Sequence, residues 1–360
     1  MADALKDQLD QAWWLQWFEL VQQAFPSHDF RPMQTAFDAE LWQSLTLKQR
    51  IKHAAEQLVL HSESQMDYAQ LINGLIQIAP KMSGLPGLVL PQVVEDCGLD
   101  EVDVSFRALE VFTCYSTGEF AIRPFIERDP ERTMSQMQAW SLDKNHHLRR
   151  LASEGCRPRL PWASPLRSLQ QDPEPIWPIL HNLMQDDSLY VRKSVANNLN
   201  DIGKDHPQAM LDFCRQWAGR GEQADWIIKH ASRNFLKQRH PDFLALMGIE
   251  PSHVEIENWQ HSAAIKIGEN LEYGFDLTGG QAPLGKLRVE LQVEFPRTQA
   301  RTYQKVFKLI ESDYRESRKR IDKTLAIKPL STRKIYPGRH GLKLIVNGEI
   351  KHQAWFEVME

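Results

Sequence analysis

The sequence has no long apolar run and only four cysteines, and each shortage excludes a class of protein. No stretch of about 18 consecutive apolar residues occurs, so a transmembrane helix is not expected. The amino terminus is acidic and amphipathic, unlike a signal peptide, and the cytoplasm is the simplest location. The cysteines form no CxxC pair and the histidines have no metal-ligand spacing. We therefore expect neither a metal nor a cofactor.

The net charge of −4 does not favour a polyanion as partner, but the charge is unevenly distributed. Residues 297–343 contain 14 Lys and Arg against 4 Asp and Glu, and residues 144–239 contain 15 against 10. The rest of the chain is acidic. Clustered cations matter more to a phosphate backbone than the total charge does. The sequence is therefore compatible with nucleic acid as a partner.

Similar helical segments recur within residues 1–250. LRRLASEG begins at Leu148, VRKSVANN at Val191 and IIKHASRN at Ile227, so the spacings are 43 and 36 residues. Spacings of about 40 residues are typical of HEAT-type helix pairs, which stack into a solenoid with a concave binding face. The fold predicted for residues 1–250 is a mainly α, HEAT-like helical-repeat solenoid.

Each repeat also carries basic side chains on the same helical segment. Stacking of the repeats would align these side chains into a basic track suited to DNA phosphates. The alternative interpretation is a solvated face of the solenoid without a binding role. The predicted track consists of Arg149, Arg150, Arg157, Arg159, Arg192, Lys193, Lys229 and Arg233.

Beyond Gly248 the helical periodicity gives way to the alternation that is typical of strands. The segment EPSHVEIENW is interpreted as a linker, and alternating apolar residues follow, for example over 287–293 and 342–346. Asn347–Gly348, between two such runs, predicts a tight hairpin turn. For residues 260–360 we predict a small all-β, antiparallel sandwich of immunoglobulin type. Its positive charge predicts a second contact with DNA.

Four motifs resemble those of one known family. They are GEFAIRPF, RRLASEGCRPRLPW, VRKSVANNLNDIGKDHP and DWIIKHASRNFLK, in this order. Together they resemble the AlkC family of bacterial DNA glycosylases, which belongs to a HEAT-like-repeat superfamily that also contains AlkD. The resemblance covers about residues 1–248. Some members of the family end in an immunoglobulin-like domain, as this chain is predicted to do.

The resemblance implies a monomeric enzyme that hydrolyses the N-glycosidic bond of 3-methyladenine and 3-methylcytosine in alkylated double-stranded DNA. It also implies that the base does not flip into a deep pocket. By position in the motifs, Glu119, Glu154 and Asp201 are the expected active-site carboxylates, and Trp162 is the expected aromatic wall beside the lesion.

The expected chemistry suits these residue types. A base methylated at N3 is cationic and leaves readily, so the main task is to stabilise the oxocarbenium-like sugar that remains. Carboxylates near C1′ can stabilise that positive charge and orient the attacking water. An indole face attracts a cationic base.

Residue type alone leaves other interpretations open at each of these positions. Glu119 could be a helix-terminal or capping acid, and Glu154 could form a surface ion pair with a neighbouring arginine. Asp201 could end a helix and pair with a lysine, and Trp162 could be a packing anchor. The corresponding alternative for the whole chain is a catalytically silent HEAT-type scaffold that binds DNA or a protein partner.

Overall fold

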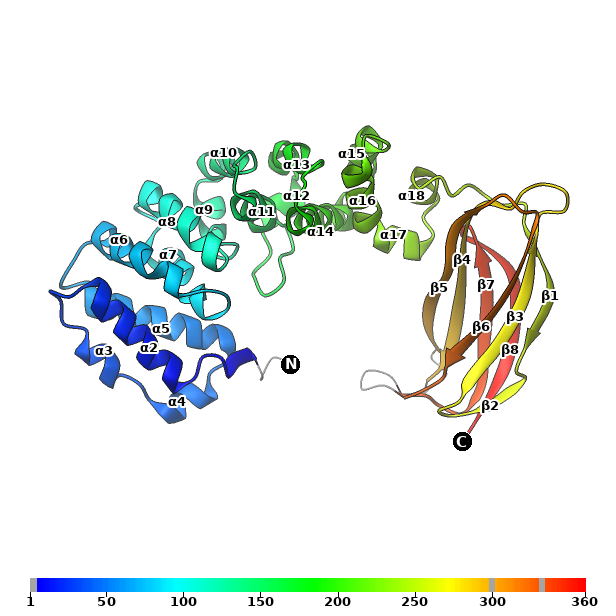
Figure 1. Ribbon diagram of the computed structural model, residues 1–360, viewed down its shortest axis with the longest axis horizontal. Helices are drawn as coiled ribbons and strands as arrows, with labels where there is room; N and C mark the ends of the chain where they lie inside the picture. Colours follow the sequence, from blue (N-terminus) through cyan, green and yellow to red (C-terminus); the bar gives the residue numbers. More distant parts are fainter. Residues whose placement is uncertain (1–4, 298–301, 330–333) are drawn as a thin grey trace. The chain divides into compact units, whose positions relative to one another are not determined.

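The computed structural model describes residues 5–297, 302–329 and 334–360. The chain divides into two compact units, Met1–Ala231 and Ser232–Glu360 (Figure 1). The first unit is helical, and the second contains two short helices followed by a β-sandwich. No helix within the described ranges is both long and apolar enough to cross a membrane.

The helical unit begins with a group of short and medium helices around a core rich in tryptophan. Trp14 and Trp17 are fully buried there. The first helices are α2 (Gln11–Ala24), α3 (Arg31–Thr35), α4 (Ala39–Ser44), α5 (Leu47–Ser62), α6 (Tyr68–Ile78), α7 (Val89–Cys97), α8 (Val102–Tyr115) and α9 (Arg123–Arg128). The later helices are α10 (Pro130–Trp140), α11 (His146–Gly155), α12 (Arg167–Gln171), α13 (Trp177–Leu183), α14 (Leu189–Asp205), α15 (Pro207–Trp217) and α16 (Glu222–Ala231).

The three repeated segments of the sequence lie on α11, α14 and α16. Helix α11 packs against α14, and α14 packs in turn against α16. Apolar residues at spacings of three and four, including Val191, Val195 and Leu199 of α14, form the buried face. The predicted helical repeat is confirmed, and it places corresponding turns of successive repeats side by side.

The second unit contains a two-layer β-sandwich (Figure 1). Its strands are β1 (Glu255–His261), β2 (Ala264–Lys266), β3 (Asn270–Thr278), β4 (Gly285–Pro296), β5 (Thr302–Tyr314), β6 (Arg318–Ala326), β7 (Gly338–Val346) and β8 (Glu349–Met359). One sheet has the strand order β1-β3-β6 and the other β2-β8-β7-β4-β5. Alternate side chains of both sheets, such as Phe275, Leu291 and Phe356, form the core between them.

The sandwich confirms the predicted all-β fold and corrects two details. Strand β2 pairs with β8 in parallel, so the sandwich is not purely antiparallel. Strand β1 begins at Glu255, inside the segment that the sequence analysis interpreted as a linker. The predicted turn at Asn347–Gly348 is confirmed: both residues have positive φ, 49° and 87°, as a tight hairpin between right-twisted strands requires.

Helices α17 (Arg233–Gln238) and α18 (Pro241–Leu246) belong to the same compact unit as the sandwich. Arg239, between them, donates to Gln292 of β4 at 2.6 Å. The chain that follows α18 is also bonded to the sandwich, because Lys286 donates to the Met247 carbonyl at 2.5 Å. The repeat pattern had placed these helices with the solenoid, up to about residue 250. In the structure the compact units divide earlier, at Ala231.

A candidate active site in the helical unit

Two of the predicted carboxylates are joined by one arginine. Glu119 lies in the turn between α8 and α9, where the Thr117 hydroxyl donates to its Oε2 at 2.8 Å. Arg150 of α11 donates to the same oxygen at 2.6 Å. Its other terminal nitrogen lies 3.7 Å from Glu154, one turn further along α11. Arg150 therefore holds both carboxylates, although the sequence separates Glu119 from the helix by about 30 residues.

The third predicted carboxylate joins the cluster through a second arginine. Arg157 donates to Glu154 at 2.7 Å and to Asp201 of α14 at 2.9 Å. Lys204, one turn after Asp201, donates to its second oxygen at 2.9 Å. The result is an unbroken line of alternating charges from Glu119 to Lys204, which we call the ion-pair chain. The packing of α11 on α14 brings its two halves together.

Most of the ion-pair chain is buried, so its interactions are weakly screened. The side chain of Asp201 is 3% exposed, that of Glu154 8% and that of Arg157 9%. Burial lowers the pKa of Arg150 and of Arg157, but the adjacent carboxylates outweigh it and raise the pKa of both above the ordinary value. Both arginines therefore remain cationic counterparts of the acids.

A cleft of about 490 Å³ opens beside the ion-pair chain. Glu119, Glu154 and Trp162, three of the four residues predicted for the reaction, line it, whereas Asp201 is not among the lining residues. The remaining wall is largely aromatic and aliphatic and includes Leu85, Leu88, Tyr115, Phe120, Leu160 and Tyr190. The cleft thus presents two carboxylates within an aromatic surface, a combination suited to a cation.

Trp162 lies in the connection 156–166 between α11 and α12, which Figure 1 shows as a long loop leaving the helices. Its side chain is 63% exposed, so it is not the buried packing anchor of the alternative interpretation. Its φ of 66° is in the left-handed region, which is uncommon for a residue with a side chain. The exposed indole is thus carried by an unusual backbone conformation.

Arg123, which the sequence analysis did not select, ties the ends of this loop together. Its guanidinium donates to the carbonyls of Gly155 and Arg157, both at 2.9 Å, and to that of Ser164 at 2.6 Å. The side chain is buried, and burial lowers its pKa. The available signal was its position in GEFAIRPF, four residues after Glu119.

Tyr190 is a second residue that the sequence analysis missed. Its ring lies 4.8 Å from the guanidinium carbon of Arg150, and it lines the cleft. Arg150 is therefore held by an aromatic face as well as by carboxylates. Tyr190 directly precedes the VRK of the second repeat, but its sequence context alone does not indicate which helix it faces.

Two alternative interpretations of the acids describe real contacts. Glu154 does pair with two neighbouring arginines, Arg150 on α11 and Arg157 just after its end, but the pairs are buried rather than on the surface. Asp201 does pair with Lys204, yet it also bonds Arg157, and α14 continues beyond it to Asp205. The contacts place both acids in one buried cluster.

Several arginines of the predicted basic track are matched by acidic or carbonyl groups of the protein. Arg149 makes a bidentate pair with Asp186 at 2.6 and 3.1 Å. Arg159 pairs with Asp205 at 2.7 Å. Arg192 donates to two backbone carbonyls at 2.8 Å. Asp186 and Asp205 thus offset the positive charge of Arg149 and Arg159, whereas Arg192 is held by carbonyls and keeps its charge.

Arg150 and Arg157 of the predicted track belong to the ion-pair chain, and the last three members occupy different places. Lys193 is exposed on α14. Lys229 lies on α16, at the end of the helical unit, whereas Arg233 opens α17 in the second unit. Among the residues that the structure describes, no group of three or more histidines, cysteines or acids could hold a metal ion.

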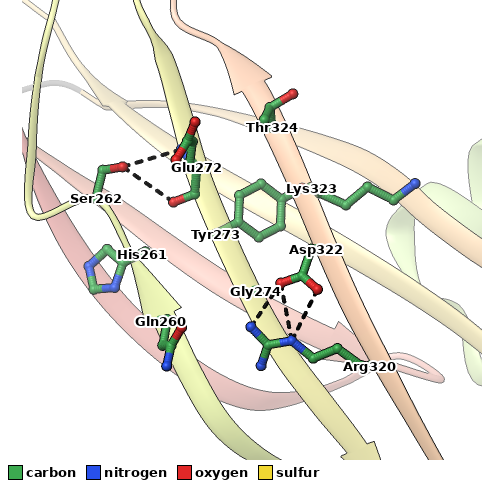
Figure 2. A pocket seen from close by; sticks show the side chains of 10 residues that line it. All are labelled: Gln260, His261, Ser262, Glu272, Tyr273, Gly274, Arg320, Asp322, Lys323 and Thr324. Carbon is green, nitrogen blue, oxygen red and sulfur yellow. Dashed lines mark hydrogen bonds and ion pairs between the residues drawn. The ribbon is translucent and has the colours of Figure 1, made fainter.

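The sandwich has a hollow of its own, of about 710 Å³, on the sheet β1-β3-β6 (Figure 2). Arg320 and Asp322 of β6 form an ion pair at 2.8 Å and lie across Gly274 of β3, where a Cβ atom would meet both side chains. These charged groups are substantially exposed, at 39% and 67%. This hollow lacks the buried acids of the helical cleft.

Comparisons with known proteins agree on both units. A family model described as "DNA alkylation repair enzyme" matches residues 113–235, and one described as "Uncharacterised protein YhaZ, C-terminal Ig-like domain" matches residues 255–360. The chain is 41% identical to the uncharacterized protein YhaZ of Bacillus subtilis (strain 168), over 94% of each chain. It is also similar to the Pseudomonas fluorescens alkylpurine DNA glycosylase AlkC, solved bound to DNA with an abasic site analog. That match has 37% identity, a TM-score of 0.88 and covers 99% of each chain.

Proposed function

The chain belongs to the AlkC family of DNA alkylation repair enzymes, and from this premise we propose that it is a DNA glycosylase acting on alkylated double-stranded DNA. Its substrates are cationic N3-alkylated bases, 3-methyladenine and 3-methylcytosine, and it works as a monomer without a metal or cofactor. The observation that carries this proposal is the cleft that combines two arginine-bound carboxylates with aromatic walls.

The proposed reaction is hydrolysis of the bond between C1′ and the base nitrogen. The bonding electrons leave with the base, which becomes neutral, and positive charge develops on the sugar. Glu119 and Glu154 line the cleft and stabilise this charge. Glu154 also accepts a proton from the water that attacks C1′, which completes the exchange of base for hydroxyl.

Asp201 has a different place in this mechanism. Its carboxylate is almost fully buried and bonds Arg157 and Lys204 rather than lining the cleft. The resemblance in sequence places Asp201 among the catalytic carboxylates, and its role in the proposed mechanism is to position Glu154 through Arg157. Substitution of either acid disturbs the same arginine.

Trp162 and the cations supply recognition. The indole lines the cleft beside Glu119 and Glu154 and offers its face to a positively charged base. The shallow, open position of this residue is compatible with a lesion that is not drawn into a deep pocket. The exposed Lys193 and the basic residues of the sandwich are the candidates for contacts with phosphates.

The test is release of free bases from methylated genomic DNA, identified by mass spectrometry. We expect 3-methyladenine and 3-methylcytosine from the wild-type protein and neither from Glu154→Gln or Asp201→Asn, with DNA binding retained by both variants. If folded wild-type protein binds DNA and releases no base, the proposed glycosylase function is wrong, and the protein is a catalytically silent DNA-binding scaffold.

A further inference from the structure

A lysine far from the motifs contacts the backbone of the exposed tryptophan. Lys48 lies in the first turn of α5, 114 residues before Trp162 in the sequence. Its ammonium donates to the Trp162 carbonyl at 2.7 Å. The same nitrogen lies 4.3 Å from the centre of the Phe120 ring, next to Glu119. One cation therefore contacts both the loop of the aromatic wall and the turn of a predicted carboxylate.

The position of Lys48 on its helix is not explained by the helix itself. The first turn of a helix is the positive end of its dipole, where a lysine is unfavourable. Helix α5 has a capping box between Thr46 and Gln49 at this end, and a lysine, which can only donate, satisfies none of the free N–H groups there. The two contacts across the fold, with a carbonyl and an aromatic face, offset the unfavourable placement.

Trp162 needs support from outside its loop. Its side chain is mostly exposed, so packing does not fix the indole, and its left-handed backbone conformation is unfavourable for a residue with a Cβ atom. Within the loop, Ala163 N–H donates to the Leu160 carbonyl at 3.3 Å and Leu166 N–H to the Pro158 carbonyl at 3.1 Å, and neither bond involves Trp162 itself. Arg123 fixes the loop ends but does not bond Trp162.

Lys48 lies beside the cleft that Trp162 lines. Lys48, Phe120 and Trp162 together line two smaller hollows next to the cleft, one of about 20 Å³ and one of about 230 Å³. Glu95 also lines both hollows, where burial raises its pKa and the positive charge of Lys48 opposes that rise. Lys48 itself is exposed and does not line the cleft.

We propose that Lys48 is a positioning residue: it holds Trp162 in the conformation that presents the indole to the base, and so couples the amino-terminal helices to the reaction. This inference rests on the proposed glycosylase function, and it gives a role to helices that precede the residues matched by the DNA alkylation repair model. Loss of the ammonium leaves the carbonyl without this partner and lets the indole leave its place.

The experiment compares full-length Lys48→Met, which keeps the aliphatic stem, with Lys48→Arg, which keeps a donor. Lys52→Met is the matched control. Lys52 is exposed and lies one turn further along α5, and its substitution removes the same charge as Lys48→Met. We expect Lys48→Met to lower the single-turnover rate of base release about 3- to 10-fold at unchanged DNA affinity. Lys48→Arg should restore most of the rate, and Lys52→Met should match the wild type.

A double-mutant cycle separates positioning from phosphate binding. If Lys48 acts through the indole, Lys48→Met has no further effect in a Trp162→Ala background. An equal loss in both backgrounds, or a loss of affinity with an unchanged rate, would assign Lys48 to DNA contact and overturn the proposal. An unchanged rate for Lys48→Met in the wild-type background would overturn it as well.

Hydrogen exchange of the amides in 157–166 tests the positioning without any reaction. We expect Lys48→Met to speed exchange of this segment several-fold and Lys52→Met to leave it unchanged. If the wild-type protein releases no base and Lys48→Met still speeds exchange, the positioning holds and the glycosylase function fails. If the wild-type protein releases base and Lys48→Met does not change hydrogen exchange in 157–166, the positioning role of Lys48 is wrong and the glycosylase function stands.

Discussion

The helical cleft and the sandwich hollow contain similar residue types in opposite settings. Both combine arginine and carboxylate side chains, but these side chains differ in their exposure to water. Glu154 of the cleft and its partner Arg157 are less than a tenth exposed, whereas Arg320 and Asp322 of the sandwich are 39% and 67% exposed. Water screens an exposed pair, while a buried pair keeps its strength and orientation. Composition alone therefore does not distinguish a reactive hollow from a solvated one.

The largest expected difference between the two hollows is in the effect of replacing one acid in each on the rate of base release. Glu154→Gln should reduce base release at least about 100-fold, because a carboxylate that stabilises the sugar cation and accepts a proton is lost. Asp322→Asn, the matched change in the sandwich, should leave the rate unchanged. Single-turnover release from methylated duplex DNA measures both, and equal rates for all three proteins would remove Glu154 from the reaction.

The second comparison is the free energy of unfolding after replacement of one arginine in each unit, Arg157 in the helical unit and Arg320 in the sandwich. Arg157→Met leaves Glu154 and Asp201 buried without their common partner, which should cost about 3–5 kcal/mol of unfolding free energy. Arg320→Met removes the exposed pair with Asp322 and a 3.8 Å contact with Asp276, which keeps its closer partner Arg318, and should lower the free energy of unfolding far less. Urea unfolding followed by circular dichroism at the helical band gives the comparison. Similar midpoints for both variants would show that the ion-pair chain contributes little to the fold.

The two exposed tryptophans allow a third comparison. Trp162→Ala should slow release of a cationic base by about 2- to 30-fold, the range that corresponds to 0.5–2 kcal/mol of cation–π attraction. Trp355→Ala, at a tryptophan of the sandwich that is 46% exposed, should not affect the rate. The effect of Trp162→Ala should also be smaller for a neutral lesion than for 3-methyladenine, and equal losses on both would contradict attraction to charge.

The smallest effect is expected for the basic residues of the sandwich. Lys319 and Lys323 are exposed on β6, and their joint replacement by glutamine should weaken DNA binding a few-fold. If each lysine contacts a phosphate, the slope of log affinity against log salt should fall by about 0.9 per lysine. Fluorescence anisotropy at several salt concentrations measures this. Base release at saturating protein should stay normal, and an unchanged slope would leave the sandwich without the predicted DNA contact.

The sequence by itself determined the classes of structure and the motifs. The recurrence of apolar residues at helical spacing from Leu148 to Ile227 predicted the stacked repeats, and Asn347–Gly348 predicted the hairpin. The hairpin signal is local to its turn, and the repeat signal depends on the recurrence of one helical pattern along the chain, so neither requires knowledge of how the elements pack. The selected residues Glu119, Glu154 and Trp162 do meet in one cleft.

Only the tertiary structure decided how those residues are connected. The bonds from Arg150 to Glu119 and from Arg157 to Asp201 join residues 31 and 44 positions apart. The first forms where α11 packs against α8, and the second where α11 packs against α14. The Lys48 contact spans 114 positions and leaves no trace in periodicity. The same holds for the parallel pairing of β2 with β8. Side-chain pattern determines which face of an element is buried, whereas the packing of the elements determines which charges face one another.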